Sequence, residues 1–474
     1  MRLYEKLLEI KKEDLTSFHV PGHKGTKLYG KYFSKINSIL DLDLTEIPGT
    51  DDLHSPEACI LESQQNASRL YKSKQSFFLI NGTTCGIYAM VMSVTSPGDK
   101  IIVSRDCHRA VFDALQLGDL EAAYVYPEID LETNIVLGVT KDSLKQCIKE
   151  NPNSKAVVLT YPNYNGVCCN IKEIIKLAHD NNMLVLVDEA HGAHLMLNDD
   201  LPISSIDAGA DIVVHSSHKS LPVFTQASML HLNSDRVSLK KLKYMLKLYQ
   251  TSSPSYILMS SLDIGMTILE EEGFERMENL ICLIEKLKVL SSNIGYKFLD
   301  RDYVKKKGFD LDITKLTLLG KKSNIDSKDF EVILRENGIQ LEFSDQNNAL
   351  FVTSICNEKA DFVKLFKTME KANYKCYSSM ETIVTTYNLQ SVLTIKNAFY
   401  TDNEVILLKD AIGRVSTDYI IPYPPGIPLV IPGERISNEI LKLIEILLRS
   451  NQKIIGDIIL DKAFANIKIS VAKA

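Results

Sequence analysis

The chain has 474 residues, of which 45% are hydrophobic and 24% charged, ordinary proportions for a protein with large buried cores. Its formal charge of −6 argues against a nucleic-acid-binding surface, because such surfaces are usually basic. No apolar run approaches the roughly 20 residues of a membrane helix. The nine cysteines are scattered without a CxxC pair, so we expect neither a disulfide framework nor a cysteine zinc site. We therefore expect a cytoplasmic protein of two or three domains.

The pattern along the chain predicts three regions. Residues 1–60 mix Gly, Pro, Asp and His and predict an N-terminal arm. Residues 61–300 predict a large domain, because apolar strands alternate with helices and such strands form a mainly parallel sheet covered on both faces. Residues 301–474 mix short strand and helix signals and predict a smaller α+β domain. The expected strands of the large domain are 76–80, 100–103, 156–160, 183–187 and 212–214, and its expected helices include 57–71, 87–94 and 171–182.

The end of the first strand carries the segment NGTTCG, residues 81–86. Its glycines let backbone amides approach an anion, and the hydroxyls of Thr83 and Thr84 can donate hydrogen bonds beside a helix N-terminus. A phosphate-binding loop is one interpretation, and a plain helix N-cap is the other. His108 follows the next strand end, where it could stack on a planar ring, bind a metal or lie in a surface loop.

Two further strand ends carry reactive groups. Asp188 ends a strongly apolar strand, where a carboxylate is costly to bury unless a cation pairs with it. That cation could be a protonated ring nitrogen, or the partner in a structural salt bridge. Lys219 follows a short strand, two serines and His218; a partly desolvated lysine has a lowered pKa and can form a Schiff base, although a surface lysine is the plainer alternative. Thirty-one residues separate Asp188 from Lys219, about one helix–loop–strand excursion, so both can reach one pocket.

Together the four strand ends predict one ligand that is anionic at one end, planar, basic at a ring nitrogen and reactive toward an amine. Pyridoxal 5′-phosphate has all these properties. A metal hydrolase is a rival interpretation, because His191/His194 and His215/His218 form two HxxH pairs, but it leaves the lysine and the hydroxyl loop unexplained. We expect no metal.

The motifs resemble those of the prokaryotic ornithine/lysine/arginine decarboxylases, in their short form. The resemblance covers nearly the whole chain, and its motifs are FHVPGHKG (18–25), DDLH (51–54), DEAHGAH (188–194), SSHK (216–219), TSSPSY (251–256) and PYPPGIPLVIPGE (422–434). It implies an α/β fold, that of the fold type I pyridoxal-phosphate enzymes related to aspartate aminotransferase. Departures are modest: Cys85, Asp106 and Arg109 stand where relatives commonly have Ser or Thr, Asn and Lys.

The resemblance also implies roles for individual residues. Lys219 would carry the cofactor covalently, Asp188 would pair with its ring nitrogen, and His108 would stack on its ring. The remaining cofactor and catalytic residues would be Thr83, Thr84 and Ser216 at the phosphate, Ala190 and His191 against the ring, His218 beside the lysine, and Ser252 at the phosphate of a neighbouring subunit. Weaker candidates for the substrate's distal cation are Asp51, His54 and Glu434.

The implied reaction is the decarboxylation of a basic amino acid. Arginine or lysine is favoured over ornithine, and the product would be agmatine, cadaverine or putrescine, together with CO₂, in polyamine biosynthesis. The family implies a homodimer, or a higher homo-oligomer, with shared active sites and without nucleic-acid or membrane partners. Two alternatives remain open: another fold type I enzyme, such as an aminotransferase, or a non-catalytic regulator that resembles a decarboxylase.

Overall fold

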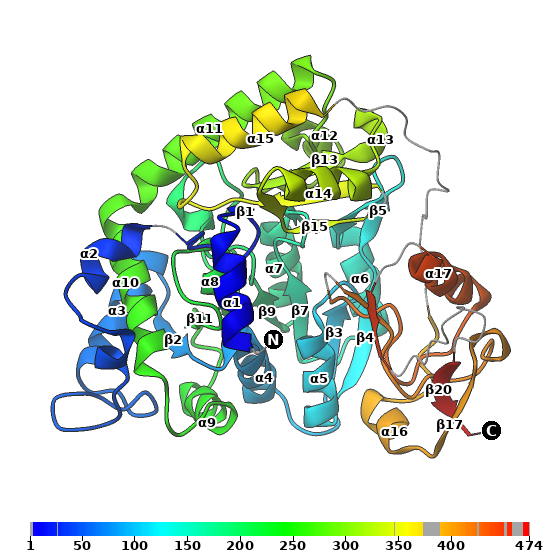
Figure 1. Cartoon of the computed structure of the whole chain (residues 1–474). Helices are drawn as coiled ribbons and strands as arrows, with labels where there is room; N and C mark the ends of the chain where they lie inside the picture. Colours follow the sequence, from blue (N-terminus) through cyan, green and yellow to red (C-terminus); the bar gives the residue numbers. More distant parts are fainter. Residues whose placement is uncertain are drawn as a thin grey trace.

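The computed structural model describes residues 3–25, 27–345, 347–372, 389–423, 426–449, 453–456 and 468–473. A seven-stranded sheet runs through the middle of the molecule (Figure 1). All strands but one run parallel, and β11 is antiparallel to both of its neighbours, β10 and β2. In spatial order the strands are β2 (Gln75–Leu79), β11 (Ser228–Leu232), β10 (Ile212–His215), β9 (Leu184–Asp188), β7 (Ala156–Thr160), β3 (Lys100–Ser104) and β4 (Glu121–Val125). The predicted mainly parallel sheet is confirmed.

Apolar side chains fill both faces of this sheet. Because side chains alternate along a strand, Val157 and Val187 pack on one face while Val158 and Leu186 pack on the other. The first face is covered by α6 (Lys141–Glu150), α7 (Ile171–Asp180) and α10 (Tyr256–Ile268). The second face is covered by α4 (Gly82–Val94), α5 (Arg109–Gly118) and α9 (Leu239–Tyr249). The strands therefore read as continuous apolar runs because neither face meets water.

One predicted boundary is wrong in a way that matters for the site. The sequence predicts a helix over 87–94, whereas α4 begins at Gly82. Gly82 has φ +76°, a conformation that glycine adopts without strain. The NGTT segment is therefore a sharp turn that passes directly into the first turn of the helix.

A second, smaller sheet joins the beginning of the chain to its later part. Its antiparallel strands are β13 (Lys315–Leu319), β16 (Asn348–Val352) and β15 (Phe343–Ser344). The N-terminal strand β1 (Thr16–Phe18) pairs in parallel with β14 (Ile339–Leu341). The neighbouring helices are α11 (Phe274–Asn293), α12 (Arg301–Lys306), α14 (Ser327–Glu336) and α15 (Lys359–Lys371). Its apolar residues share one core with the first face of the central sheet.

The last described part of the chain has an apolar cluster of its own, which includes Leu408, Ile420, Val430 and Ile440. Its elements are α16 (Ile395–Tyr400), α17 (Asn438–Arg449) and two strand pairs, β17 (Asn403–Leu407) with β20 (Lys468–Ala472) and β18 (Ile421–Tyr423) with β19 (Lys453–Ile455). The predicted domain boundaries at residues 60 and 300 stay predictions.

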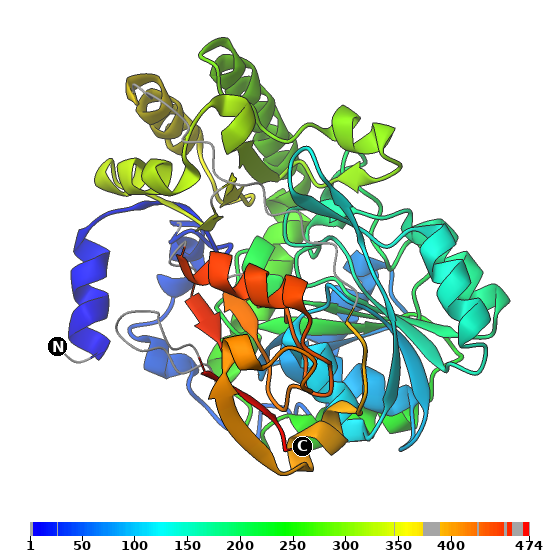
Figure 2. The same cartoon turned by 90° about the vertical axis from the view of Figure 1, so that its right-hand side faces the viewer.

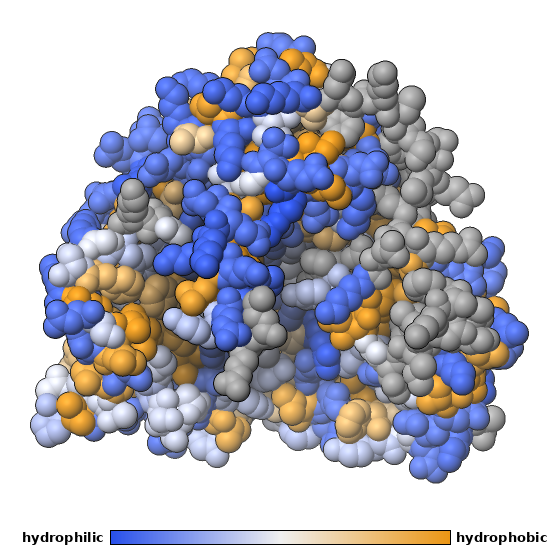
Figure 3. All heavy atoms as spheres, viewed as in Figure 1, coloured by the Kyte–Doolittle hydropathy of each residue, from blue (hydrophilic) through white to orange (hydrophobic). Residues whose placement is uncertain are grey.

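The first helix, α1 (Leu3–Lys12), has no buried residue and stands apart from the body of the chain (Figure 2). Leu3, Tyr4 and Leu7 are 76%, 72% and 55% exposed. Apolar side chains also gather at the lower left of Figure 3, over the segment that carries the exposed Leu40 and Ile47. Among the described residues, no helix is both long and apolar enough to cross a membrane.

Candidate active site

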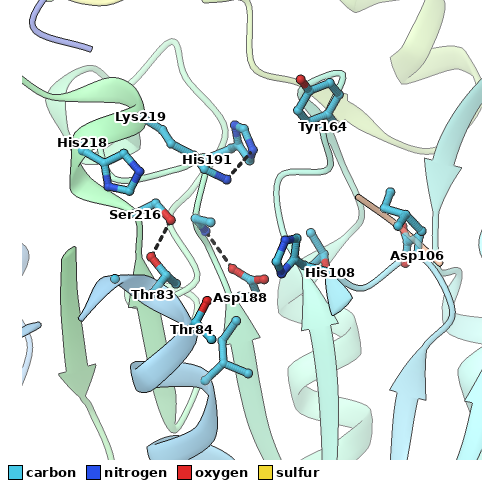
Figure 4. A pocket seen from close by; sticks show the side chains of 15 residues that line it. Thr83, Thr84, Asp106, His108, Tyr164, Asp188, His191, Ser216, His218 and Lys219 are labelled. Carbon is cyan, nitrogen blue, oxygen red and sulfur yellow. Dashed lines mark hydrogen bonds between the residues drawn. The ribbon is translucent and has the colours of Figure 1, made fainter. Parts of the chain in front are cut away.

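The carboxyl ends of the central strands surround a cavity of about 240 Å³ (Figure 4). Nine of the predicted site residues line it: Thr83, Thr84, His108, Asp188, Ala190, His191, Ser216, His218 and Lys219. The remaining lining residues are Gly82, Ile87, Asp106, Thr160, Tyr164 and Ile427. Residues far apart in the sequence meet here because parallel strands end at the same edge of the sheet.

One end of the cavity suits an anion. The side chain of Asn81 does not cap α4 but accepts a hydrogen bond from the backbone N–H of Thr251 at 3.2 Å. The helix N-terminus therefore faces the cavity without a side-chain cap. Beside it, Thr83 Oγ1 lies 2.5 Å from Ser216 Oγ and 2.9 Å from Ser228 Oγ. Backbone N–H groups and hydroxyls gathered at a helix N-terminus can bind a phosphate.

Asp188 places a buried carboxylate in the floor of the cavity. It is 2% exposed, and its Oδ1 accepts a hydrogen bond from the Ala190 N–H at 3.1 Å. Burial raises the pKa of Asp188, and the nearby Lys219 opposes that rise only in part. A cationic ring nitrogen in the cavity would supply the close positive partner that the carboxylate needs.

Lys219 lies in α8 (Ser217–Ser220), directly after β10. Burial lowers the pKa of Lys219, while Asp188 and Glu342 act in the opposite direction. Its Nζ lies 3.0 Å from His191 Nε2 (Figure 4). A lysine with a lowered pKa supplies more neutral amine, which is the nucleophilic form.

Two more histidines form part of the cavity wall. His108 Nδ1 accepts a hydrogen bond from the Ala110 N–H at 3.2 Å, so the ring caps α5. Burial lowers the pKa of His108 to about 4, and the positive charge of Lys219 acts in the same direction, so the ring is neutral at pH 7. His218 Nδ1 lies 3.0 Å from the carbonyl oxygen of Ala227, and burial lowers its pKa to about 4. A neutral ring at position 108 can stack on a planar ligand.

Four predicted residues do not line the cavity in this chain. The carboxylate of Asp51 accepts hydrogen bonds from the backbone N–H groups of residues 57, 58, 60 and 61 at the start of α3 (Cys59–Tyr71). His54 Nε2 bonds the carbonyl oxygen of Thr251 at 2.8 Å, and Ser252 is exposed. Glu434 is fully buried and pairs with Arg105 at 2.9 Å. Asp51 and Glu434 thus have structural partners, and the predicted substrate and partner-subunit contacts of all four stay predictions.

The two HxxH pairs do not converge on one point. His191 bonds lysine amines, whereas His194 Nε2 lies 3.0 Å from Thr314 Oγ1 and 3.1 Å from an oxygen of Asp312. His215 bonds His231 at 3.0 Å, and His218 bonds a backbone carbonyl. Each ring serves a different contact.

The sequence missed several residues of this site. Tyr164 lines the cavity, lies edge-on to the His191 ring and donates its hydroxyl to Glu342 at 2.9 Å. Tyr164 could have been predicted, because it follows the predicted strand over 156–160, whose carboxyl end lies at the same edge of the sheet as the other strand ends. Lys315, which bonds His191 Nδ1 at 2.7 Å, gave no such signal. It alternates with leucines in β13 and therefore resembles the solvent side of a half-buried strand.

These observations fit pyridoxal phosphate. The uncapped helix N-terminus and its hydroxyls suit the phosphate, and the buried Asp188 carboxylate suits a protonated ring nitrogen. Lys219 supplies an amine, and His108 and Ala190 supply surfaces for a flat ring. The cavity therefore offers a group for the phosphate, the ring, the ring nitrogen and the aldehyde of the cofactor.

Comparison with known proteins gives the same result. Residues 2–311 match the family model described as Orn/Lys/Arg decarboxylase, major domain, and residues 370–456 match its C-terminal domain. The arginine decarboxylase of Bacillus subtilis is 34% identical over 92% of this chain and 91% of its own. The inducible lysine decarboxylase of Escherichia coli is 23% identical over 94% of this chain and 76% of its own. The structure of the Francisella novicida lysine decarboxylase shares the fold, with a TM-score of 0.78, 21% identity and coverage of 99% of this chain and 80% of that one. The chain belongs to the Orn/Lys/Arg decarboxylase family and is an amino-acid decarboxylase whose cofactor is pyridoxal phosphate.

Proposed function

We propose that this enzyme converts L-arginine to agmatine and CO₂. The observation that carries the proposal is that Lys219 and Asp188 line one cavity beside the uncapped N-terminus of α4. The choice of arginine is supported by the relatives, because the arginine decarboxylase of Bacillus subtilis is 34% identical and the inducible lysine decarboxylase of Escherichia coli is 23% identical. Agmatine is a polyamine precursor, so we place the reaction in polyamine biosynthesis in the cytoplasm.

The residues of the cavity would divide the work. When bound, pyridoxal phosphate supplies an aldehyde for the substrate amine and a ring that accepts the electrons left behind by CO₂. Thr83, Thr84 and Ser216 would hold its phosphate, and Asp188 would keep a proton on its ring nitrogen. Of these contributions we expect the charge of Asp188 to matter most, because a fixed charge in a buried site needs no rearrangement during the reaction.

Proton transfer to the substrate Cα falls to Lys219 in this proposal. His218 is a weak source of protons at neutral pH, because burial lowers its pKa to about 4 and its Nδ1 is held at the Ala227 carbonyl oxygen. The Lys219 amine lies in the same cavity, and as a neutral amine it can take the proton that the substrate α-ammonium group gives up and deliver it to Cα. We therefore expect His218 to position the lysine rather than to donate the proton.

Glu342 is our candidate for attracting the positively charged side chain of arginine. Its carboxylate accepts the Tyr164 hydroxyl at 2.9 Å and the Val20 N–H at 2.8 Å, one hydrogen bond from the cavity wall. It also acts on the pKa of Lys219, so its field reaches the cavity. A carboxylate has about four acceptor positions, which leaves room for a guanidinium.

The test is a CO₂-release assay with arginine, lysine and ornithine. We expect the highest kcat/KM with arginine, and a tenfold or greater rise of KM for arginine in Glu342→Gln, because one charge-assisted contact contributes roughly 1.5–3 kcal/mol. Glu331→Gln is the matched control, since Glu331 is bonded to Ser344 of the same small sheet and does not line the cavity. A preference for lysine or ornithine would refute the choice of substrate.

A further inference from the structure

The ring of His191 lies between two lysine amines. Its Nε2 is 3.0 Å from Nζ of Lys219, and its Nδ1 is 2.7 Å from Nζ of Lys315. Lys219 lines the cavity, whereas Lys315 starts β13 of the smaller sheet and is 2% exposed. One imidazole therefore joins the lysine of the active site to a second, fully buried lysine behind the cavity wall.

The charged form of Lys315 is favoured at neutral pH. Burial lowers its pKa to about 8, against the effects of Asp312 and Glu342, which raise it. Among the described residues, the hydrogen-bond partner of its Nζ is the His191 ring. Burying an ammonium group costs free energy unless it donates hydrogen bonds. The contact with Nδ1 of His191 is therefore the main stabilising contact of this charge.

The hydrogen-bonding capacity of each group limits where the protons can lie in the row formed by Lys219, His191 and Lys315. A neutral imidazole has one N–H and one acceptor nitrogen, whereas an ammonium group only donates. Burial holds the pKa of His191 well below its ordinary value, so the ring is neutral. Two ammonium groups cannot both donate to a neutral ring. One of the two amines must therefore be unprotonated and accept the ring N–H.

We propose that Lys315 is a positioning residue that keeps Lys219 in its neutral, reactive form. The Lys315 ammonium donates to Nδ1 of His191, which places the ring proton on Nε2. That N–H then donates to the lone pair of Lys219 Nζ. The inference deepens the proposed function, because it depends on Lys219 being the amine that bonds the cofactor.

Other charged or titratable groups surround the two amines. They are Asp188, Glu342, Asp312, Lys24, His108 and His218. None of them bonds either nitrogen of His191 in the structure, so a change at Lys315 alters the row without removing any of them. Its effect on Lys219 has a definite sign: loss of a nearby positive charge raises the pKa of the remaining amine.

The first experiment needs no variant. In the full-length protein before cofactor loading, ¹⁵N NMR of labelled histidine reports which ring nitrogen carries the proton, and the His191 signals are assigned by their loss in His191→Asn. We expect Nδ1 to be the acceptor and Nε2 to carry the proton at pH 7. A proton on Nδ1, or on both nitrogens, would overturn the proposal.

The second experiment measures how fast the same protein takes up pyridoxal phosphate as a function of pH. The lone pair of Nζ forms a bond to the aldehyde carbon, and the condensation releases one water. We expect Lys315→Met to shift the pH profile upward by about one unit, so that uptake slows about tenfold at pH values well below the midpoint of the wild-type profile. Lys315→Arg keeps the charge and should restore most of the rate.

Lys24→Met is the matched control. Lys24 is also a buried lysine, but its Nζ donates to the backbone carbonyls of His19 and Val352, at 2.6 and 2.8 Å. Its loss should shift the profile much less than the loss of Lys315, because its ammonium group bonds backbone carbonyls and not the His191 ring. Profiles that coincide for wild type and Lys315→Met, with the cofactor still on Lys219, would refute this inference alone. If peptide mass spectrometry placed the cofactor on another lysine, the proposed function would fail as well.

Discussion

At the scale of single residues, the chemistry of the site follows from burial. Burial raises the pKa of Asp188 and lowers the pKa of Lys219, so it favours the neutral form of both side chains. In water at neutral pH, both side chains would be charged. The sequence could predict these two residues, because a charged group at the end of an apolar strand must have a partner. It could not predict Lys315, whose burial depends on a second sheet packed against His191.

Asp188→Asn should separate stability from activity. Because the folded protein raises the pKa of Asp188, this group favours folding below its unfolded pKa of about 4, and the benefit is lost as the pH rises through the higher folded value. Without cofactor, the variant should therefore unfold at a higher temperature than wild type at pH 7.5, and the difference should shrink toward pH 4. Its kcat should fall by about 100-fold or more. Thermal unfolding and CO₂ release measure the two effects.

Asp51→Asn is the comparison for that result. Burial would raise the pKa of Asp51, but its bonds from backbone N–H groups outweigh burial and lower it. This carboxylate stabilises the fold above its unfolded pKa, and the benefit is lost as the pH falls. The variant should therefore lose thermal stability at pH 7.5. A less stable Asp188→Asn protein at that pH, without cofactor, would contradict our account of the site.

At the scale of elements, the strands were predictable and their contacts were not. The strand over 156–160 was predicted with the bounds that β7 has, because a continuous apolar run leaves little choice. The start of α4 was missed, because threonines after a glycine look like a loop. The role of Glu434 could not be read from its neighbours. Its partner, Arg105, is more than 300 positions away and also bonds the carbonyl oxygens of Pro428 and Leu429.

The Arg105–Glu434 pair should hold the segment around residues 426–434 over the cavity. Glu434→Gln leaves a buried guanidinium without its charged partner, so we expect the free energy of unfolding to fall by about 3–5 kcal/mol in urea titrations. Lys396→Ala is the control: Lys396 and Asp119 form an exposed pair at 2.9 Å between the same parts of the chain, and such pairs contribute about 0–1 kcal/mol. Equal losses in the two variants would show that burial is not what gives the pair its strength.

At the scale of the whole molecule, one chain leaves apolar surface uncovered. The exposed residues of α1, together with the exposed loop that carries Ser252, fit the homodimer with shared active sites that the resemblance implies, and we propose that two subunits complete each other's sites. The central sheet and most of the cavity could be predicted from the sequence, because both depend on local patterns. A surface that would pair with a second copy could not, since no local pattern distinguishes it from a helix packed within one chain.

Mixed dimers test the sharing of sites. Lys219→Ala and Ser252→Asp should each be inactive when pure. If Ser252 serves its partner, a dimer of one chain of each kind has one site with both defects and one intact site, and it should show about half the activity of a wild-type dimer. Ser253→Asp, at the next exposed position, is the control and should be active as a pure protein, without mixing with another variant. Mixed dimers without activity would mean that Ser252 acts only within its own subunit.

The pairing of β1 with β14 has a consequence for how the protein is made. About 320 residues separate Thr16 from Ile339, yet they lie side by side in one parallel pair, with Phe18 fully buried among later aromatic rings. A ribosome adding 5–20 residues per second needs roughly 15–65 s to supply the second strand. Throughout that interval β1 has no strand to pair with and Phe18 stays exposed. We therefore expect the N-terminal strand to be among the last parts of the chain to fold.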